Sequence, residues 1–343
     1  MDEAAIRAHA GEGAYVVGGA VRDGLLGRPV VDFDVACRDP EGAARAHADA
    51  TGGALFPLSE RHGAWRVAFR DGRTVDFTPL RNGIEADLAT RDFTVNAIAR
   101  RVGSRELVDP LGGRSDLEHR TLRAVTPDVF RDDPLRLLRA VRLEGELGFR
   151  LEDATAALVR RDAALVDRSA GERILDELAR LSEAGFRRLD ELGLLAPLGG
   201  SLERLDAVEP AQHADYLLVV TLGEALLRLP TSNDTRRFAR RLLAARAPED
   251  DSARAIHRYR RATEPWALEA LAYLGRGDLA GAIEAARARD PAEPLLRGDE
   301  LGVPPGPEIG RLLALVEEER AAGTISTREE ALELVRRFAT PPT

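Results

Sequence analysis

Two aspartates separated by one residue, Asp32 and Asp34, are the side chains best placed to do chemistry in this sequence. Side chains two apart on a strand project from the same face, so the two carboxylates can form a hard-oxygen site for Mg²⁺. Acid pairs with this spacing are also common on exposed strands, so the interpretation needs support from other residues. A third acid, Asp76, follows a predicted hairpin turn and could complete a three-carboxylate cluster or face water.

Two glycines, Gly18 and Gly19, separate a predicted strand from a predicted helix earlier in the chain. Backbone amides at such a junction can approach a phosphate closely. Arg22 lies one turn into the helix and could bind the same anion through its forked guanidinium. The alternative is a tight turn with Arg22 on the surface.

Residues 89–100 combine an apolar side with the polar groups of Arg91, Asp92 and Asn96. A sugar hydroxyl and a phosphate need such a mixture of directional donors and acceptors. The alternative is a helix capped by Asp92 with a buried Asn96. Both interpretations place the segment in a helix over residues 84–100.

Asp133 and Pro134 form a typical helix start, and Gly148 a typical helix end. A carboxylate beside an arginine, here Asp133 and Arg136, can present an acceptor and a donor to the edge of a nucleobase. The alternative role for Asp133 is that of a plain helix cap.

Arginines recur every three residues on this helix, and that spacing keeps Arg136, Arg139 and Arg142 on one side of it. Three like charges in a row are unfavourable unless an anion lies against them. The alternative is a solvated face balanced by Glu144 and Glu146.

The elements that must position these residues divide the chain into two parts. Strands are predicted at residues 14–19, 30–36, 64–70 and 73–78, with helices at 20–27 and 84–100. Asp71 and Gly72 predict a two-residue hairpin turn between the last two strands. From residue 117 onward, leucine, alanine, arginine and glutamate recur at helical spacing. We therefore expect an α+β fold, with an α/β head built on a mixed sheet and a long helical remainder.

The composition excludes several classes of function. The chain has 343 residues and no lysine, so all 49 basic residues are arginine, against 58 acidic residues and a net charge of −9. A Walker-type lysine, a Schiff-base amine and a strongly basic nucleic-acid binder are thereby excluded. The single cysteine, Cys37, excludes an internal disulfide and a cysteine-rich zinc site. With no signal peptide or apolar span in the sequence, we expect a cytoplasmic protein that does not enter a membrane.

Charge is distributed unevenly along the helical part. Residues 231–261 carry nine arginines against four acids, or +5, whereas residues 262–343 carry nine arginines against fifteen acids, or −6. The basic segment is either a local phosphate-binding surface or a solvated helix face.

Five motifs occur in order over the first 150 residues: VGGAVRD, the Asp32 and Asp34 pair, RDFTVNA, VDPLGGRSDL and RDDPLRLLRAVR. Together they resemble the class II tRNA nucleotidyltransferase (CCA-adding enzyme) and bacterial poly(A) polymerase family. The resemblance extends more loosely to LLRGDELGVPPGPEIGRLLALVEEERAAG near the C-terminus.

The resemblance implies a role for each candidate residue. It implies that Asp32 and Asp34 bind catalytic Mg²⁺, with Asp76 as a further catalytic candidate. The remaining residues would bind the nucleoside triphosphate: Gly18, Gly19 and Arg22 at its phosphates, Arg91, Asp92 and Asn96 at its ribose and phosphates, Asp133 and Arg136 as the amino-acid template for the base, and Arg139 and Arg142 in support.

The family also implies four domains: a catalytic head (1–116), a helical neck that recognises the base (117–180), a helical body that binds RNA (181–262) and a helical tail that binds tRNA (263–343). The implied activity is addition of CMP, with AMP as a further expected substrate, from CTP and ATP to the 3′ end of tRNA. The enzyme would contact the 3′ end and acceptor arm of its tRNA.

Three departures from the family pattern bear on this interpretation. Thr90 stands where many members have a second arginine before Arg91, and Asp132 replaces a glutamate beside Asp133. Only fourteen residues, 77–90, separate Asp76 from Arg91, whereas CCA-adding relatives usually have a longer loop. The short loop resembles members that add only two cytidines, so a CC-adding enzyme is an alternative. A poly(A) polymerase and an inactive RNA-binding protein are the others.

Some relatives carry a His/Asp metal-phosphohydrolase domain. Here His213 and Asp215 lack an adjacent His-Asp pair, so we do not expect a metal hydrolase site.

Overall fold

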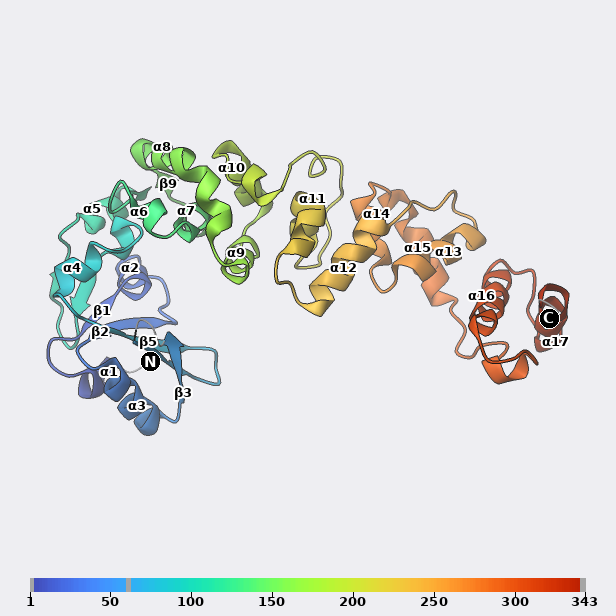
Figure 1. The fold of residues 1–343 in the computed structure, drawn as a ribbon, viewed down its shortest axis with the longest axis horizontal. Coiled ribbons are helices and arrows are strands. Elements are labelled where there is room, and N and C mark those ends of the chain that lie inside the picture. The colour runs from blue at the N-terminus through green and yellow to red at the C-terminus, as the bar shows by residue number, and fades with distance from the viewer. Residues whose placement is uncertain (1–2, 60–62, 340–343) are drawn as a thin grey trace. The chain divides into compact units, whose positions relative to one another are not determined.

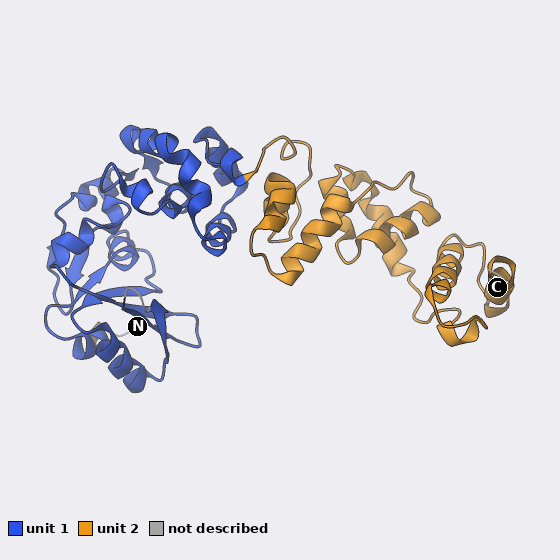
Figure 2. Cartoon of the chain, viewed as in Figure 1, with its two compact units in different colours: residues 1–198 blue, residues 199–343 orange. Residues whose placement is uncertain are grey.

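The structure, a computed structural model, describes residues 3–59 and 63–339. The chain divides into two compact units, residues 1–198 and 199–343 (Figure 2). This division falls inside the predicted body, and the four-domain scheme stays a prediction.

A mixed seven-stranded sheet, counted over the described residues, forms the centre of the first unit. Its strand order is β3-β4-β5-β2-β1-β6-β7, and β2 pairs with β5 in parallel while the other neighbours are antiparallel. The strands are β1 (Tyr15–Val17), β2 (Phe33–Cys37), β3 (Ala54–Ser59), β4 (Ala64–Ala68), β5 (Thr74–Pro79), β6 (Ala99–Arg101) and β7 (Leu107–Val108). The predicted mixed sheet is confirmed.

Helices cover both faces of this sheet (Figure 1). On one face, α1 (Glu3–Ala10) and α3 (Pro40–Thr51) pack on a core that includes Val35, Val67 and Phe77. On the other face, α2 (Gly19–Leu25) follows β1, and α4 (Ile84–Leu88) contributes to a core with Val17 and Ala36. Because successive side chains of a strand alternate between faces, Asp34, Arg66 and Asp76 lie on the second face of the sheet.

The hairpin between β4 and β5 is present, but its turn is longer than predicted. Phe69 N donates to Arg73 O at 2.9 Å and Gly72 N donates to Phe69 O at 3.1 Å, so the turn between this last hydrogen-bonded pair has three residues, 70–72. Gly72 has φ 87°, as the last residue of such a turn requires. Strand pairing explains the difference, because this register places Val67 opposite Val75 in the core.

The helix predicted over residues 84–100 is wrong. The chain forms α4, then a single 3-10 turn, η1 (Thr94–Asn96), and then strand β6. Phe93 is extended and bridges to Ala124, and Val125 N donates to Asp92 O at 3.2 Å. Tertiary hydrogen bonding and the need to pair with β1 therefore override the helical spacing of the apolar residues.

The rest of the first unit is mainly helical. It contains α5 (Gly113–Glu118), α6 (Val129–Asp132), α7 (Leu135–Leu147), α8 (Asp153–Asp162), α9 (Gly171–Leu178), α10 (Glu183–Glu191), the 3-10 helices η2 (Ala163–Arg168) and η3 (Ala196–Leu198), and a small parallel pair of β8 (Thr121–Leu122) and β9 (Arg150–Leu151). Asp133 Oδ1 accepts from Leu135 N at 3.2 Å, and Gly148 ends α7 with φ 65°. The predicted start and end of this helix are confirmed to within a residue.

All the regular elements in the described residues of the second unit are helices. It contains α11 (Tyr216–Leu222), α12 (Asn233–Ala244), α13 (Ala253–Thr263), α14 (Ala267–Tyr273), α15 (Ala280–Ala288), α16 (Pro307–Ala321) and α17 (Arg328–Phe338), with 3-10 helices η4 (Gly223–Arg228), η5 (Gly277–Leu279) and η6 (Gly298–Glu300). The fold class, an α/β head followed by a helical remainder, is confirmed.

Among the described residues, none of the helices has the length and apolar character that crossing a membrane requires.

Candidate active site

The glycine turn between β1 and α2 lies directly against two other predicted site residues. Gly18 has φ 70°, which favours glycine. A Cβ atom placed on Gly18 would lie 2.8 Å from Nη1 of Arg91 and 3.3 Å from Oδ2 of Asp34. The turn therefore brings Arg91 and Asp34 together, and the absence of a side chain at Gly18 permits it.

Three carboxylates, Asp32, Asp34 and Asp76, form what we call the carboxylate row. Asp34 of β2 is paired directly with Asp76 of β5 in the parallel register. Asp32 lies just before β2, where its Oδ1 accepts from N and Oγ1 of Thr74 at 3.0 and 2.8 Å. Burial raises the pKa of Asp34; Arg91 opposes the rise, whereas Asp76 and Asp32 add to it.

The donor set of this row fits Mg²⁺ through two of its members. Arg66 of β4 binds both oxygens of Asp76, with Nε to Oδ1 at 2.7 Å and Nη2 to Oδ2 at 2.6 Å. Over residues 3–59 and 63–339, no group of three or more His, Cys, Asp or Glu side chains is arranged to hold a metal ion. Asp32 and Asp34 still offer hard oxygen ligands, and Mg²⁺ is commonly held by one or two carboxylates together with substrate phosphates.

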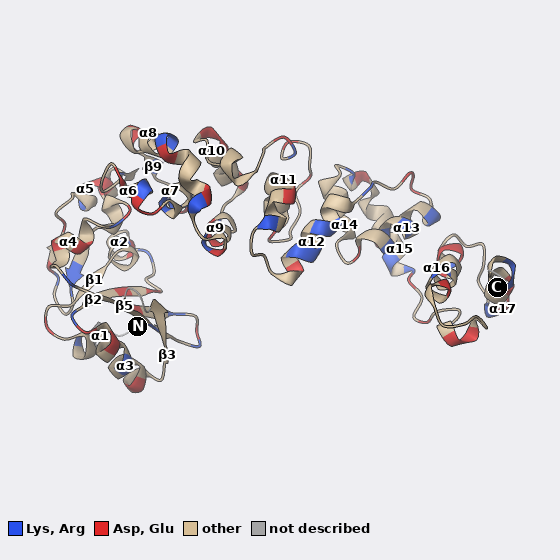
Figure 3. Cartoon of the chain, viewed as in Figure 1, with Lys and Arg blue, Asp and Glu red and all other residues tan. Residues whose placement is uncertain are grey.

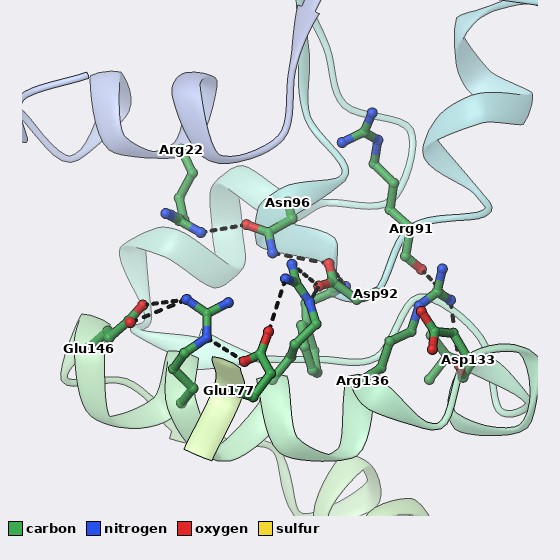
Figure 4. Close-up of polar contacts among 12 residues, drawn as sticks. Arg22, Arg91, Asp92, Asn96, Asp133, Arg136, Glu146 and Glu177 are labelled. Atoms are coloured by element: carbon green, nitrogen blue, oxygen red, sulfur yellow. Dashed lines mark hydrogen bonds and ion pairs between the residues drawn. The ribbon is translucent and has the colours of Figure 1, made fainter. Parts of the chain in front are cut away.

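A second group of polar residues, which we call the polar chain, connects α2 to α7 and α9 (Figure 4). Arg22 Nη1 donates to Asn96 Oδ1 at 2.7 Å, and Asn96 Nδ2 donates to Asp92 Oδ1 at 3.0 Å. Asp92 Oδ2 accepts from Nε of Arg139 at 2.9 Å. Residues far apart in the sequence thus form one continuous network.

Asp92 is the centre of this network and is 6% exposed. Burial alone would raise its pKa, but Arg139, Asn96 and the amide of Phe93 outweigh burial and lower the pKa. Both carboxylate oxygens therefore already have protein donors, and Asp92 positions Asn96 and Arg139 around it.

Glu177 of α9 extends the polar chain and was not among the predicted residues. It is 7% exposed, and its Oε2 accepts from Nε of Arg142 at 2.6 Å. Arg139 Nη1 lies 3.6 Å from its other oxygen, and Arg142 also pairs with Glu146 at 3.0 Å. The predicted row of arginines thus has buried protein partners at Arg139 and Arg142 rather than a solvated face.

The predicted template residues, Asp133 and Arg136, lie near each other at the start of α7 (Figure 4). Asp133 pairs with Arg173 of α9 at 2.9 Å, a residue that the sequence did not single out. Arg136 Nη2 donates to the backbone oxygen of Thr90 at 2.7 Å. Helix α7 is thereby attached to the segment that carries Arg91.

Arg91 has a carboxylate partner of its own, Asp87, which lies at 3.1 Å. With Nη1 against Gly18, its guanidinium lies between the glycine turn and α4. Of the predicted site residues, Gly18, Asp34 and Arg91 meet at this turn, whereas Arg142 contacts Glu177 and Glu146 at the far end of α7 from Arg136.

The second unit contains an arginine-lined cavity of about 1010 Å³ between α12 and α13. Figure 3 marks the arginine positions along α12 in blue. Its lining includes Arg237, Arg240, Arg241, Arg246, Arg254 and Arg258, together with Trp266. Trp266 packs on Phe238, which in turn stacks on His213 with ring centroids 3.6 Å apart. The basic segment seen in the sequence is therefore folded into one concave surface, and His213 is an aromatic packing residue.

Two protein-family models match parts of this chain. The family model described as the poly A polymerase head domain matches residues 14–85 and 68–123. The model described as a probable RNA and SrmB-binding site of polymerase A matches residues 148–201. These ranges contain the carboxylate row, the glycine turn and α9.

Similar proteins cover nearly the whole chain. An A-adding tRNA nucleotidyltransferase of Deinococcus radiodurans is 36% identical, over 95% of this chain and 96% of its own. A CC-adding tRNA nucleotidyltransferase of Thermus thermophilus is 33% identical, over 93% and 92%. Among solved structures, the CCA-adding enzyme of Bacillus stearothermophilus in complex with CTP has a TM-score of 0.74 and 27% identity, over 98% of this chain and 96% of that one.

Proposed function

Because the chain belongs to the tRNA nucleotidyltransferase and poly(A) polymerase family, we propose that it adds CMP, and then AMP, to the 3′ end of tRNA. The observation that carries this proposal is the meeting of Asp34, Gly18 and Arg91 beside a helix that bears Asp133 and Arg136. Metal ligands, phosphate contacts and base contacts are the three kinds of group that nucleotidyl transfer needs.

In the proposed reaction the 3′-oxygen of the tRNA attacks the α-phosphorus of CTP in line. A bond from this oxygen to phosphorus forms, the bond to the bridging oxygen breaks, and pyrophosphate and the hydroxyl proton leave. Asp32 and Asp34 would hold Mg²⁺, which when bound supplies charge that activates the hydroxyl and neutralises the leaving group.

The other residues would position the nucleotide. Gly18 N already donates to Ile98 O at 3.3 Å, so Gly19 would offer its amide to the phosphates, and Arg22 and Arg91 lie next to the two glycines as phosphate donors. Asn96 would orient the ribose while Asp92 holds Asn96 in place. Asp133 and Arg136 would present acceptor and donor groups to the base, with Arg139 and Arg142 anchoring their helix from behind.

The test of this proposal is the variant Asp32→Ala with a tRNA that lacks its terminal CCA. We expect no incorporation of labelled CMP, and tRNA affinity within about twofold of the original, since Asp32 contributes to chemistry and not to RNA contacts. Incorporation at the original rate would refute the assignment. An inactive RNA-binding protein, the alternative of another class, would bind the tRNA yet release no pyrophosphate in either form.

A CC-only product is the second candidate, and a specific observation favours it. Just four residues, 80–83, connect β5 to α4, and Leu80 N is already bonded to Cys37 O at 2.8 Å. The full-length relative from Thermus thermophilus is named CC-adding, whereas the one from Deinococcus radiodurans is named A-adding. The test uses three tRNA substrates, which end before CCA, in C or in CC. Each is incubated with CTP alone, with ATP alone and with both, and the products are sized. The product lengths distinguish CCA, CC, A and poly(A) addition.

The arginine-lined cavity is the proposed tRNA surface of the second unit. Arg240 and Arg246 are exposed and have no ion-pair partner among the described residues, so they are available to phosphates. We expect the double variant Arg240→Ala with Arg246→Ala to weaken tRNA binding and to reduce the slope of log affinity against log salt by about 1 to 2. The exposed Arg105→Ala in the first unit is the matched control, and an equal loss there would refute a specific role for the cavity.

A further inference from the structure

Arg66 of β4 belongs to none of the motifs, yet it makes the most direct contact with the carboxylate row. Its bidentate pair with Asp76 has distances of 2.7 and 2.6 Å, within the range of strong charge-assisted hydrogen bonds. Asp76 is 7% exposed, so few of its lone pairs can be reached from solvent.

The sheet register explains why Arg66 lies there. Arg66 of β4 is directly opposite Asp76 of β5, and Asp76 is directly opposite Asp34 of β2. Three neighbouring strands thus present arginine, aspartate and aspartate in a line on one face. Like charges directly opposite each other on a sheet are unfavourable, and an opposite charge on the next strand offsets that cost.

Arg66 changes the net charge of the carboxylate row. The row alone carries −3, and with Arg66 it carries −2, which one divalent cation neutralises. Both oxygens of Asp76 accept from Arg66, so a metal ion would have to compete with a bidentate guanidinium for them.

We propose that Arg66 is a built-in counter-cation that keeps Asp76 out of the metal coordination, so that divalent metal binds through Asp32 and Asp34 alone. This inference rests on the proposed function, because it concerns the metal of the proposed reaction. Arg66 and Asp76 are then positioning residues, which set the charge and the spacing beside Asp34 without touching the metal.

The test measures Mn²⁺ binding to the full chain without nucleotide, by electron paramagnetic resonance of the free ion. Removing only the guanidinium, in Arg66→Gln, releases Asp76 as an additional ligand, and we expect affinity to rise about tenfold. Removing both members of the pair, in Arg66→Gln with Asp76→Asn, should leave affinity within about twofold of the original, because the pair is neutral and neither partner binds metal.

The opposite results would overturn the proposal. If Asp76 is a ligand in the original protein, the double variant loses about tenfold or more in affinity. If Arg66 has no electrostatic role, Arg66→Gln leaves the affinity unchanged. Arg66→Lys retains the charge and should bind Mn²⁺ less tightly than Arg66→Gln does.

Two controls separate this inference from the proposed function. Asp34→Asn should abolish Mn²⁺ binding; if it does not, the metal site itself is elsewhere and the proposed function is at fault. Arg45→Gln removes an arginine from an exposed pair with Glu41 on α3 and should change nothing. Thermal unfolding of each variant verifies that it is folded. In the double variant both positions carry neutral side chains, so no unpaired charge at the buried position 76 opposes folding.

Discussion

Asp34 and Asp92 are both surrounded by arginines and other polar groups, but their pKa values move in opposite directions. In the carboxylate row, burial raises the pKa of Asp34. Arg91 lowers this pKa, whereas the negative charges of Asp76 and Asp32 raise it further. In the polar chain, Arg139, Asn96 and the Phe93 amide more than offset burial and lower the pKa of Asp92. One region has an excess of negative charge, and the other is internally balanced.

This difference separates two tasks within one unit. A carboxylate that is costly to keep charged gains most from an incoming cation, as a metal site requires. A carboxylate whose oxygens are all bonded to protein donors gains nothing from a ligand and holds its neighbours in place. We therefore expect substitutions in the carboxylate row to reduce activity and not stability, and substitutions in the polar chain to reduce stability most.

The largest expected effect is on activity, in Asp34→Asn. Loss of the proposed metal ligand should reduce CMP incorporation at least about a thousandfold, since a bound metal is worth several kcal/mol in the transition state. The same variant should unfold at a higher temperature at pH 7. The raised pKa means that the protonated form favours folding, so stability from this group is present at acid pH and is lost as pH rises through the raised pKa. A lower unfolding temperature would contradict the comparison.

The second effect is on stability, in Asp92→Asn. Loss of one partner leaves Arg139 without its main counter-charge, and we expect the free energy of unfolding to fall by about 3 kcal/mol. Urea unfolding at pH 7 measures it. Asp92→Asn should also weaken CTP binding through displacement of Asn96, whereas an unchanged stability would show that the polar chain is not a structural unit.

The third effect is the pH dependence of that loss. Because the folded pKa of Asp92 is lowered, its stabilisation is present above the unfolded value of about 3.9 and disappears as pH falls through the folded pKa. The difference in unfolding free energy between the original protein and Asp92→Asn should therefore be constant from pH 7 to about 5 and should shrink below about 4. A difference that grows at acid pH would have the wrong sign.

The smallest effect is expected where both partners of an ion pair are exposed. Asp234 and Arg237 on α12 have side chains 82% and 72% exposed. Asp234→Ala should change the free energy of unfolding by less than about 0.5 kcal/mol, as solvent and salt screen the pair. A loss comparable to that of Asp92→Asn would remove the distinction between buried and exposed pairs.

The sequence was sufficient for the elements whose signals are local. The strand before Gly18, the pair of strands around Asp71 and the helix from Asp133 to Gly148 depend on glycine, proline and alternation, which act within a few residues. The helix predicted over 84–100 failed because its hydrogen-bond partners, such as Val125, lie far along the chain.

The site residues divide in the same way. Asp34, Gly18 and Arg91 stand in motifs and do meet in the structure, whereas Glu177 and Arg173 act across 35 and 40 residues and carry no local signal. The predicted two-residue turn at Asp71 and Gly72 would place Arg66 opposite Phe77, away from the carboxylate row. The apolar pattern that pairs Val67 with Val75 in fact indicates the three-residue turn and sets Arg66 opposite Asp76.

The position of Trp266 in the arginine-lined cavity has a spectroscopic consequence. The chain contains two tryptophans, and the other, Trp65, lies on β4 next to Arg66 in the first unit. Trp266 lines the cavity proposed for RNA, whereas Trp65 is paired with Phe77 and packs on the core of the sheet face opposite Asp76. In a Trp65→Phe protein, quenching of the remaining emission would therefore follow RNA entering the second unit, with no external label.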